Sequence, residues 1–156
     1  MKDENGVVYL DNNATTQVDE RVLSEMLPFF TQHYGNPSGK YYPQAEIAKK
    51  AVETSRIKCA KLIGAKPQEI IFTSGATEAN NLAIKGYCLA NEIKGKHIIT
   101  SLIKHRSVLD PLKELQTQGY NVTYLEPDHY GRISVRDIEN AITEETVLVT
   151  NMFANG

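Results

Sequence analysis

The stretch that decides the fold is IIFTSGATEANN, residues 70–81. Its apolar run ends at Phe72 and predicts a short strand over residues 69–72. The residues after the turn have helical spacing and predict a helix over residues 77–88. A strand that runs through a small-residue turn into a helix is typical of α/β proteins with parallel sheets.

The turn between these two elements is suited to binding an anion. The first amides of a helix lack intrahelical partners, and the helix dipole favours negative charge there. Gly75 and Ala76 leave the backbone open to a phosphate, and the Thr77 hydroxyl can donate to it. The alternative is a plain helix start, capped by Ser74 and with Glu78 in the first turn. The sequence is not a P-loop, because the Gly-Lys-Ser/Thr segment is absent.

Outward from this stretch, helices and strands alternate. Further helices are expected over residues 19–30, 45–63, 107–116 and 135–142, and further strands over 97–100, 122–125 and 146–150. This order predicts a mostly parallel sheet with flanking helices. Ligands of such sheets bind where strands end, so we expect the site just after Phe72, Thr100 and Thr150.

Two further strand ends carry suitable side chains. His105 follows the strand at 97–100, where an imidazole can stack on a planar ligand or move a proton near neutral pH. Residues 151–156 follow the last strand and contain two asparagines that can donate to a ligand oxygen. With the phosphate turn, they suggest an aromatic phosphorylated cofactor. Each could instead be an ordinary solvated loop residue, whereas His33, His97 and His129 are expected to be structural.

Two polar turns could border the same site. One, residues 11–16, contains Asn13, and the other, residues 34–38, contains Asn36. Their alternative explanation is Asx and Gly-Pro turn chemistry.

Composition excludes several classes of protein. The chain has 156 residues and a formal net charge of −2, without the basic excess of a nucleic-acid-binding protein. No apolar run approaches the length of a membrane helix, and residues 1–6 lack the apolar core of a secretory signal, so we expect a cytoplasmic protein. Cys59 and Cys88 cannot form a disulfide framework or a metal site, and we expect both to be small buried side chains in helices.

In its turns and strand ends the chain resembles the cysteine desulfurases, pyridoxal-phosphate enzymes of the class-V aminotransferase type. The matching segments are VYLDNNATT (8–16), YGNPS (34–38), FTSGATE (72–78), His105 and the Ala154-Asn155 pair. The resemblance implies that Ala76 and Thr77 hold the pyridoxal 5'-phosphate and that Gly75 provides room. It also implies that His105 stacks on the ring and assists proton transfer, and that Asn155 contacts the ring oxygen.

The resemblance implies a fold, a substrate and partners as well. The fold is the N-terminal part of the pyridoxal-phosphate transferase fold (fold type I). Residues 1–32 would belong to an N-terminal arm and small domain, and residues 33–156 to the first part of the large cofactor-binding domain. L-cysteine would be the substrate, its sulfur passing to an enzyme cysteine persulfide and then to an iron–sulfur scaffold or another acceptor protein. A homodimer is expected, with no nucleic acid, membrane or metal.

Some of the family's parts are not found in this chain. The Schiff-base lysine and the persulfide cysteine lie beyond position 156 in the family, so we expect the isolated chain to be inactive. The strands that join residues 69–72 to the other strands also come later, which would leave the sheet incomplete. Lys104 stands where the family usually has a glutamate before the histidine.

Other functions stay open. A selenocysteine lyase or an aminotransferase could use the same scaffold. A truncated, catalytically inert remnant could act only as a binding module.

Overall fold

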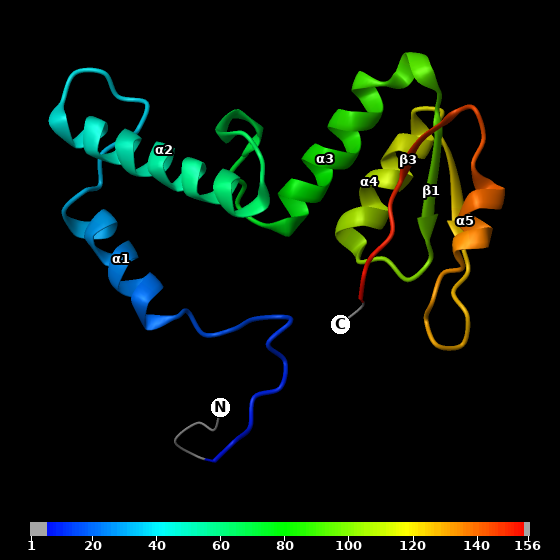
Figure 1. Ribbon diagram of the computed structural model, residues 1–156, viewed down its shortest axis with the longest axis horizontal. Coiled ribbons are helices and arrows are strands. Elements are labelled where there is room, and N and C mark those ends of the chain that lie inside the picture. The colour runs from blue at the N-terminus through cyan, green and yellow to red at the C-terminus, as the bar shows by residue number, and fades with distance from the viewer. Residues whose placement is uncertain (1–5, 155–156) are drawn as a thin grey trace. The chain divides into compact units, whose positions relative to one another are not determined.

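The computed structural model describes residues 6–154 (Figure 1). Its contacts divide the chain into two compact units, Met1–Phe72 and Thr73–Gly156, and each is described by itself. The division falls between Phe72 and Thr73, inside the stretch at residues 70–81. The family-based boundary at residues 32 and 33 concerns a whole subunit and stays a prediction.

The first unit is built on two helices, α1 (Glu20–Thr31) and α2 (Pro43–Ile63). The Asp19 carboxylate caps α1 by accepting a hydrogen bond from the Arg21 amide at 2.9 Å. Helix α2 ends at Gly64, whose φ of 69° is the left-handed conformation that glycine adopts most readily. Both helices are confirmed close to their expected ends.

The expected strand at residues 69–72 is wrong. A 3-10 turn, η1 (Pro67–Glu69), occupies its start, and Ile70 follows with extended dihedral angles. A strand needs a neighbouring strand to take its backbone groups, and none pairs with residues 70–72 within the described chain. The Arg56 guanidinium instead donates to the Ile70 carbonyl and lies 5.1 Å from the centre of the Phe72 ring.

The second unit alternates helices and strands as predicted. Its elements are α3 (Ala76–Ala90), η2 (Glu92–Lys94), β1 (His97–Ser101), α4 (Arg106–Thr117), β2 (Asn121–Leu125), α5 (Val135–Ala141) and β3 (Thr146–Val149). The strands form a parallel sheet in the order β2-β1-β3, with β1 in the centre. This confirms the expected α/β class with a parallel sheet and flanking helices.

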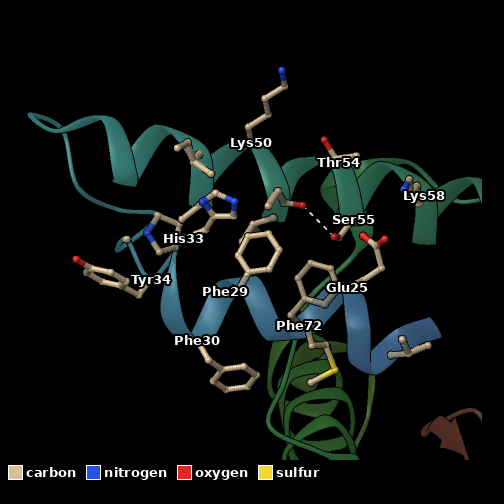
Figure 2. A pocket seen from close by; sticks show the side chains of 18 of the residues that line it. Glu25, Phe29, Phe30, His33, Tyr34, Lys50, Thr54, Ser55, Lys58 and Phe72 are labelled. Carbon is tan, nitrogen blue, oxygen red and sulfur yellow. Dashed lines mark hydrogen bonds between the residues drawn. The ribbon is translucent and has the colours of Figure 1, made fainter. Parts of the chain in front are cut away.

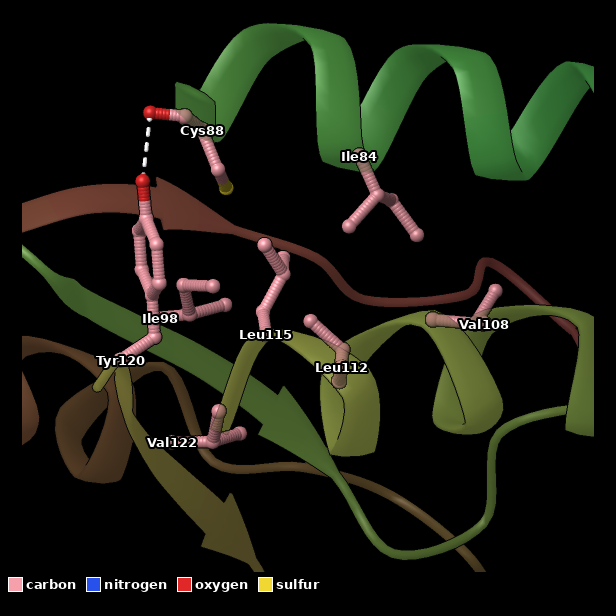
Figure 3. Packing of buried hydrophobic residues seen from close by; sticks show 8 residues of the cluster. All are labelled: Ile84, Cys88, Ile98, Val108, Leu112, Leu115, Tyr120 and Val122. Atoms are coloured by element: carbon pink, nitrogen blue, oxygen red, sulfur yellow. Dashed lines mark hydrogen bonds between the residues drawn. The ribbon is translucent and has the colours of Figure 1, made fainter. Parts of the chain in front are cut away.

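The core of the second unit lies between the sheet and the pair α3 and α4 (Figure 3). Ile98 of β1 and Leu112 and Leu115 of α4 are fully buried, and they pack with Cys88 of α3. Because side chains alternate along a strand, Ile99 points to the opposite face, where it lies beside Ile138 of α5 around a small void. Helices therefore cover both faces of β1.

His97 joins all three strands where they begin. It is 4% exposed, and its two ring nitrogens lie 2.7 Å from the Thr146 hydroxyl and 2.8 Å from the Thr123 hydroxyl. These partners belong to β3 and β2 respectively. His97 is thus a buried structural residue at the end of the sheet where the strands start.

The two cysteines differ. Cys88 is fully buried in the core, as predicted, and burial raises the pKa of its thiol. Cys59 is exposed, so the expectation that it is buried is wrong. The reason is that α2 buries only Ala45, Ala48 and Ala60. No helix formed by residues 6–154 has the length and apolar character needed to cross a bilayer.

Candidate functional site

The second unit gathers two helix starts at one edge of its sheet. Strand β1 ends at Ser101, and a short loop leads to His105, the N-cap of α4. The Asn80 side chain, one turn into α3, donates to the Ser107 hydroxyl in the first turn of α4 at 2.9 Å. The N-termini of α3 and α4 therefore lie together at the edge where β1 ends, and they bring the predicted phosphate turn near His105.

The start of α3 leaves its amides open. Gly75 is the N-cap, and in this part of the described chain no side chain makes a capping hydrogen bond to the helix. The alternative in which Ser74 caps the helix is therefore wrong. Ser74 donates instead from its amide at 2.6 Å and its hydroxyl at 2.7 Å to Oε2 of Glu78. Both bonds lower the pKa of Glu78, and the bond from the hydroxyl contributes most. The carboxylate is therefore ionised at neutral pH.

The geometry at this helix start fits a phosphate group. A Cβ added to Gly75 would meet no described atom within 4 Å, so the space before the first turn is open. The side chains of Ala76 and Thr77 are exposed there, and the first-turn amides lack intrahelical acceptors. The Glu78 charge opposes a bound anion, but two hydrogen bonds from Ser74 already hold its Oε2.

His105 is held through one ring nitrogen. Its Nδ1 accepts from the Ser107 amide at 3.1 Å and lies 2.9 Å from the Ser107 hydroxyl. The imidazole is otherwise exposed, so its ring face is accessible to a planar ligand.

Lys104, which precedes His105, is 9% exposed, and burial lowers the pKa of its ammonium group. Within residues 6–154 no carboxylate forms an ion pair with it.

The other predicted site residues are Asn13, Asn36 and Asn155. Asn155 lies outside the described residues. Asn13 and Asn36 belong to the first unit, whereas His105 and the phosphate turn belong to the second. Asn36 forms an Asx turn, in which its Oδ1 accepts from the Ser38 amide at 2.9 Å. The site role of all three stays a prediction.

Sequence reasoning missed two residues that the structure places at this edge. Asn80 and Ser107 connect α3 to His105, and the sequence assigned a role in the site to neither, although Asn80 lies in the stretch at residues 70–81. Helical periodicity places Asn80 on α3 but does not say which helix it contacts. Only the packing of α3 on α4 shows that the two side chains meet.

The first unit carries an open groove of about 1280 Å³, formed between α1 and α2 (Figure 2). Its walls are mainly apolar and include Met26 and Phe29 of α1, Ala48 and Val52 of α2, and Phe72. Helix α1 buries none of its own residues against the described chain. The groove belongs to the first unit, whereas the candidate residues Gly75, Ala76, Thr77 and His105 belong to the second.

Comparison with known proteins gives consistent matches over nearly the whole chain. The family model "Aminotransferase class-V" matches residues 8–156. A cysteine desulfurase IscS of Clostridium botulinum is 50% identical over 151 residues, which is 97% of this chain and 38% of the relative. The chain thus spans well under half the length of this curated relative.

Solved structures agree with the sequence relatives. A NifS-like protein superimposes with a TM-score of 0.88 and 41% identity, covering 95% of this chain and 40% of that one. A structure described as SspA in complex with cysteine has a TM-score of 0.80 and 41% identity, covering 88% of this chain and 40% of that one.

Proposed function

The chain belongs to the class-V aminotransferase family, and we propose that it is the N-terminal part of a pyridoxal-phosphate-dependent cysteine desulfurase. One observation carries this proposal. In a chain 50% identical to a cysteine desulfurase, the open start of α3 and the ring of His105 lie at the same edge of the sheet. A phosphate and an aromatic ring on one cofactor match these two features.

Each residue has a distinct part in holding the cofactor. The first-turn amides at Ala76 and Thr77, with the Thr77 hydroxyl, would hold the phosphate, and Gly75 would leave room for it. The His105 ring would stack on the pyridine ring and would assist proton transfer. Asn155 would donate to the ring oxygen. When bound, pyridoxal 5'-phosphate supplies the electron sink that lets the carbon–sulfur bond of cysteine break.

L-cysteine is the proposed substrate, and the structure described as SspA in complex with cysteine supports it. The sulfur passes to a persulfide cysteine of the whole enzyme, which is neither Cys59 nor Cys88. Iron–sulfur cluster assembly or another thiolation pathway then receives it through a scaffold or acceptor protein. We further propose a cytoplasmic homodimer, as expected for the family.

The test uses the full-length protein. With L-cysteine and a reductant, we expect alanine and sulfide in equal amounts, and a visible absorption band from the bound cofactor. A His105→Ala variant should shift this band or slow turnover, whereas Cys59→Ser should leave both unchanged. Formation of a keto acid in place of alanine would instead indicate an aminotransferase, and activity on selenocysteine alone a selenocysteine lyase.

A non-enzymatic function has its own test. If the 156-residue chain works alone as a binding module, borohydride should fix pyridoxal phosphate to none of its lysines. Reproducible capture at one lysine, lost when that lysine is replaced, would contradict this alternative.

A further inference from the structure

Three side chains form a continuous hydrogen-bonded chain between α3 and α4. Asn80 Nδ2 donates to the Ser107 hydroxyl at 2.9 Å, and that hydroxyl lies 2.9 Å from Nδ1 of His105. The Ser107 amide donates to the same Nδ1 at 3.1 Å. Ser107 is 7% exposed, so this link is shielded from water. His105 at the end of the chain remains exposed.

The donors in this chain determine which ring nitrogen carries the proton. A backbone amide can only donate, so Nδ1 of His105 must present its lone pair, and in a neutral ring the proton lies on Nε2. The Asn80 amide group occupies a lone pair of the Ser107 oxygen. The Ser107 hydrogen is then free to point at Nδ1, where it adds a second donor.

We propose that Ser107 and Asn80 are positioning residues that hold His105 as the Nε2–H tautomer with its ring plane fixed. Nδ1 is turned toward the start of α4, which leaves Nε2–H as the nitrogen available to a ligand. This inference rests on the proposed role of His105 at the cofactor. It adds that two residues from different helices set the ring before any ligand binds.

The hydrogen bond between Asn80 and Ser107 also links the starts of α3 and α4. Asn80 and Ser107 meet across the contact between α3 and α4, one turn from the open amides of α3 and two residues from His105. A change in how the helices pack would therefore disturb the phosphate turn and the imidazole together.

The decisive measurement is the tautomer of His105 in the full-length protein, read by NMR of [15N]histidine and assigned with His105→Gln. At about pH 9 an ordinary histidine is neutral. We expect an unprotonated Nδ1 and a protonated Nε2. Ser107→Ala removes one donor to Nδ1 and should lower the ratio of Nε2–H to Nδ1–H by about fivefold.

A second variant tests the link from Asn80 and covers the case in which Ser107→Ala fails to fold. Asn80→Asp is nearly isosteric but offers only acceptor oxygens, so it should draw the Ser107 hydrogen away from His105 and shift the ratio in the same direction. Asn91→Ala is the matched control, because the side-chain amide of Asn91 donates to the Tyr87 carbonyl at the far end of α3. It should leave the tautomer unchanged.

The outcomes separate this inference from the proposed function. A protonated Nδ1 in the unchanged protein would overturn the inference, as would Ser107→Ala and Asn80→Asp variants that both match Asn91→Ala. The visible absorption of added pyridoxal phosphate is recorded on the same samples. The expected tautomer pattern without cofactor binding would support the positioning chain and refute the cofactor role. Cofactor binding with the wrong tautomer would do the reverse.

Discussion

The Tyr120 hydroxyl offers a measurable test of how the core joins α3 to the sheet. Tyr120 is 4% exposed, and its hydroxyl donates to the Cys88 carbonyl at 2.8 Å (Figure 3). Burial raises the pKa of this hydroxyl, so it remains a protonated donor. Tyr120→Phe removes the hydroxyl and keeps the ring in the core.

The expected cost follows from what the Cys88 carbonyl still binds. This carbonyl also accepts from the backbone N–H of Asn91 at 3.1 Å, so the substitution does not leave a buried acceptor unpaired. The loss is then one net hydrogen bond, about 0.5–1.5 kcal/mol, and not the larger penalty of an orphaned group. Tyr124→Phe is the matched control, because the Tyr124 hydroxyl bonds to an exposed Gln116 at 3.0 Å. Its cost should stay within about 0.5 kcal/mol.

Amide hydrogen exchange in the full-length protein measures the local free-energy cost of losing the Tyr120 hydroxyl. It does not require the whole chain to unfold in one step. Peptides from α3 and β2 should exchange about two to thirteen times faster in Tyr120→Phe, the factor for 0.5–1.5 kcal/mol. They should be nearly unchanged in Tyr124→Phe. Equal protection in both variants would show that the buried hydroxyl contributes nothing. A loss above about 3 kcal/mol would show that the Cys88 carbonyl had been left unpaired.

Three other predictions concern the site and the titrating groups. Thr77→Ala should weaken pyridoxal phosphate binding by about 1–3 kcal/mol through loss of a charge-assisted hydrogen bond, and an unchanged Kd would remove Thr77 from the site. Burial holds the pKa of Lys104 below its ordinary value of 10.5, so the unfolded state binds more protons between these two values and stability rises with pH in that window. Urea midpoints measured up to pH 10.5 should show this rise in the unchanged protein and a smaller one in Lys104→Met. Cys59 should react with a thiol reagent in the folded protein, and Cys88 only after unfolding; peptide mapping that finds Cys88 modified first would contradict its burial.

The helices and their ends could be predicted from the sequence because the interactions that define them are local. The carboxylate of Asp19 caps α1 through an amide two residues away, and Gly64 ends α2 by its own backbone conformation. The strands at 97–100, 122–125 and 146–150 were also predictable, because each apolar run follows a recognisable helix. The family was predicted differently, from the resemblance of the motifs and His105 to those of the cysteine desulfurases.

The failures have a common cause in contacts between distant residues. Residues 69–72 have the composition of a strand, but a strand forms only where a neighbour takes its hydrogen bonds, and Arg56 takes the Ile70 carbonyl instead. Cysteine is a residue type that is usually buried, but Cys59 is exposed because α2 buries only Ala45, Ala48 and Ala60. Neither outcome can be read from a window of sequence around the residue.

The sequence by itself therefore determined the helices, the alternation that makes a parallel sheet, and the residue types offered at its edge, since these depend on neighbours along the chain. Only the tertiary structure decided that His97 joins three strands and that Lys104 is buried. It alone decided that Asn80 reaches His105 through Ser107. The physical reason is that burial and hydrogen-bond partners across a fold depend on which surfaces pack together, and no local pattern encodes that choice.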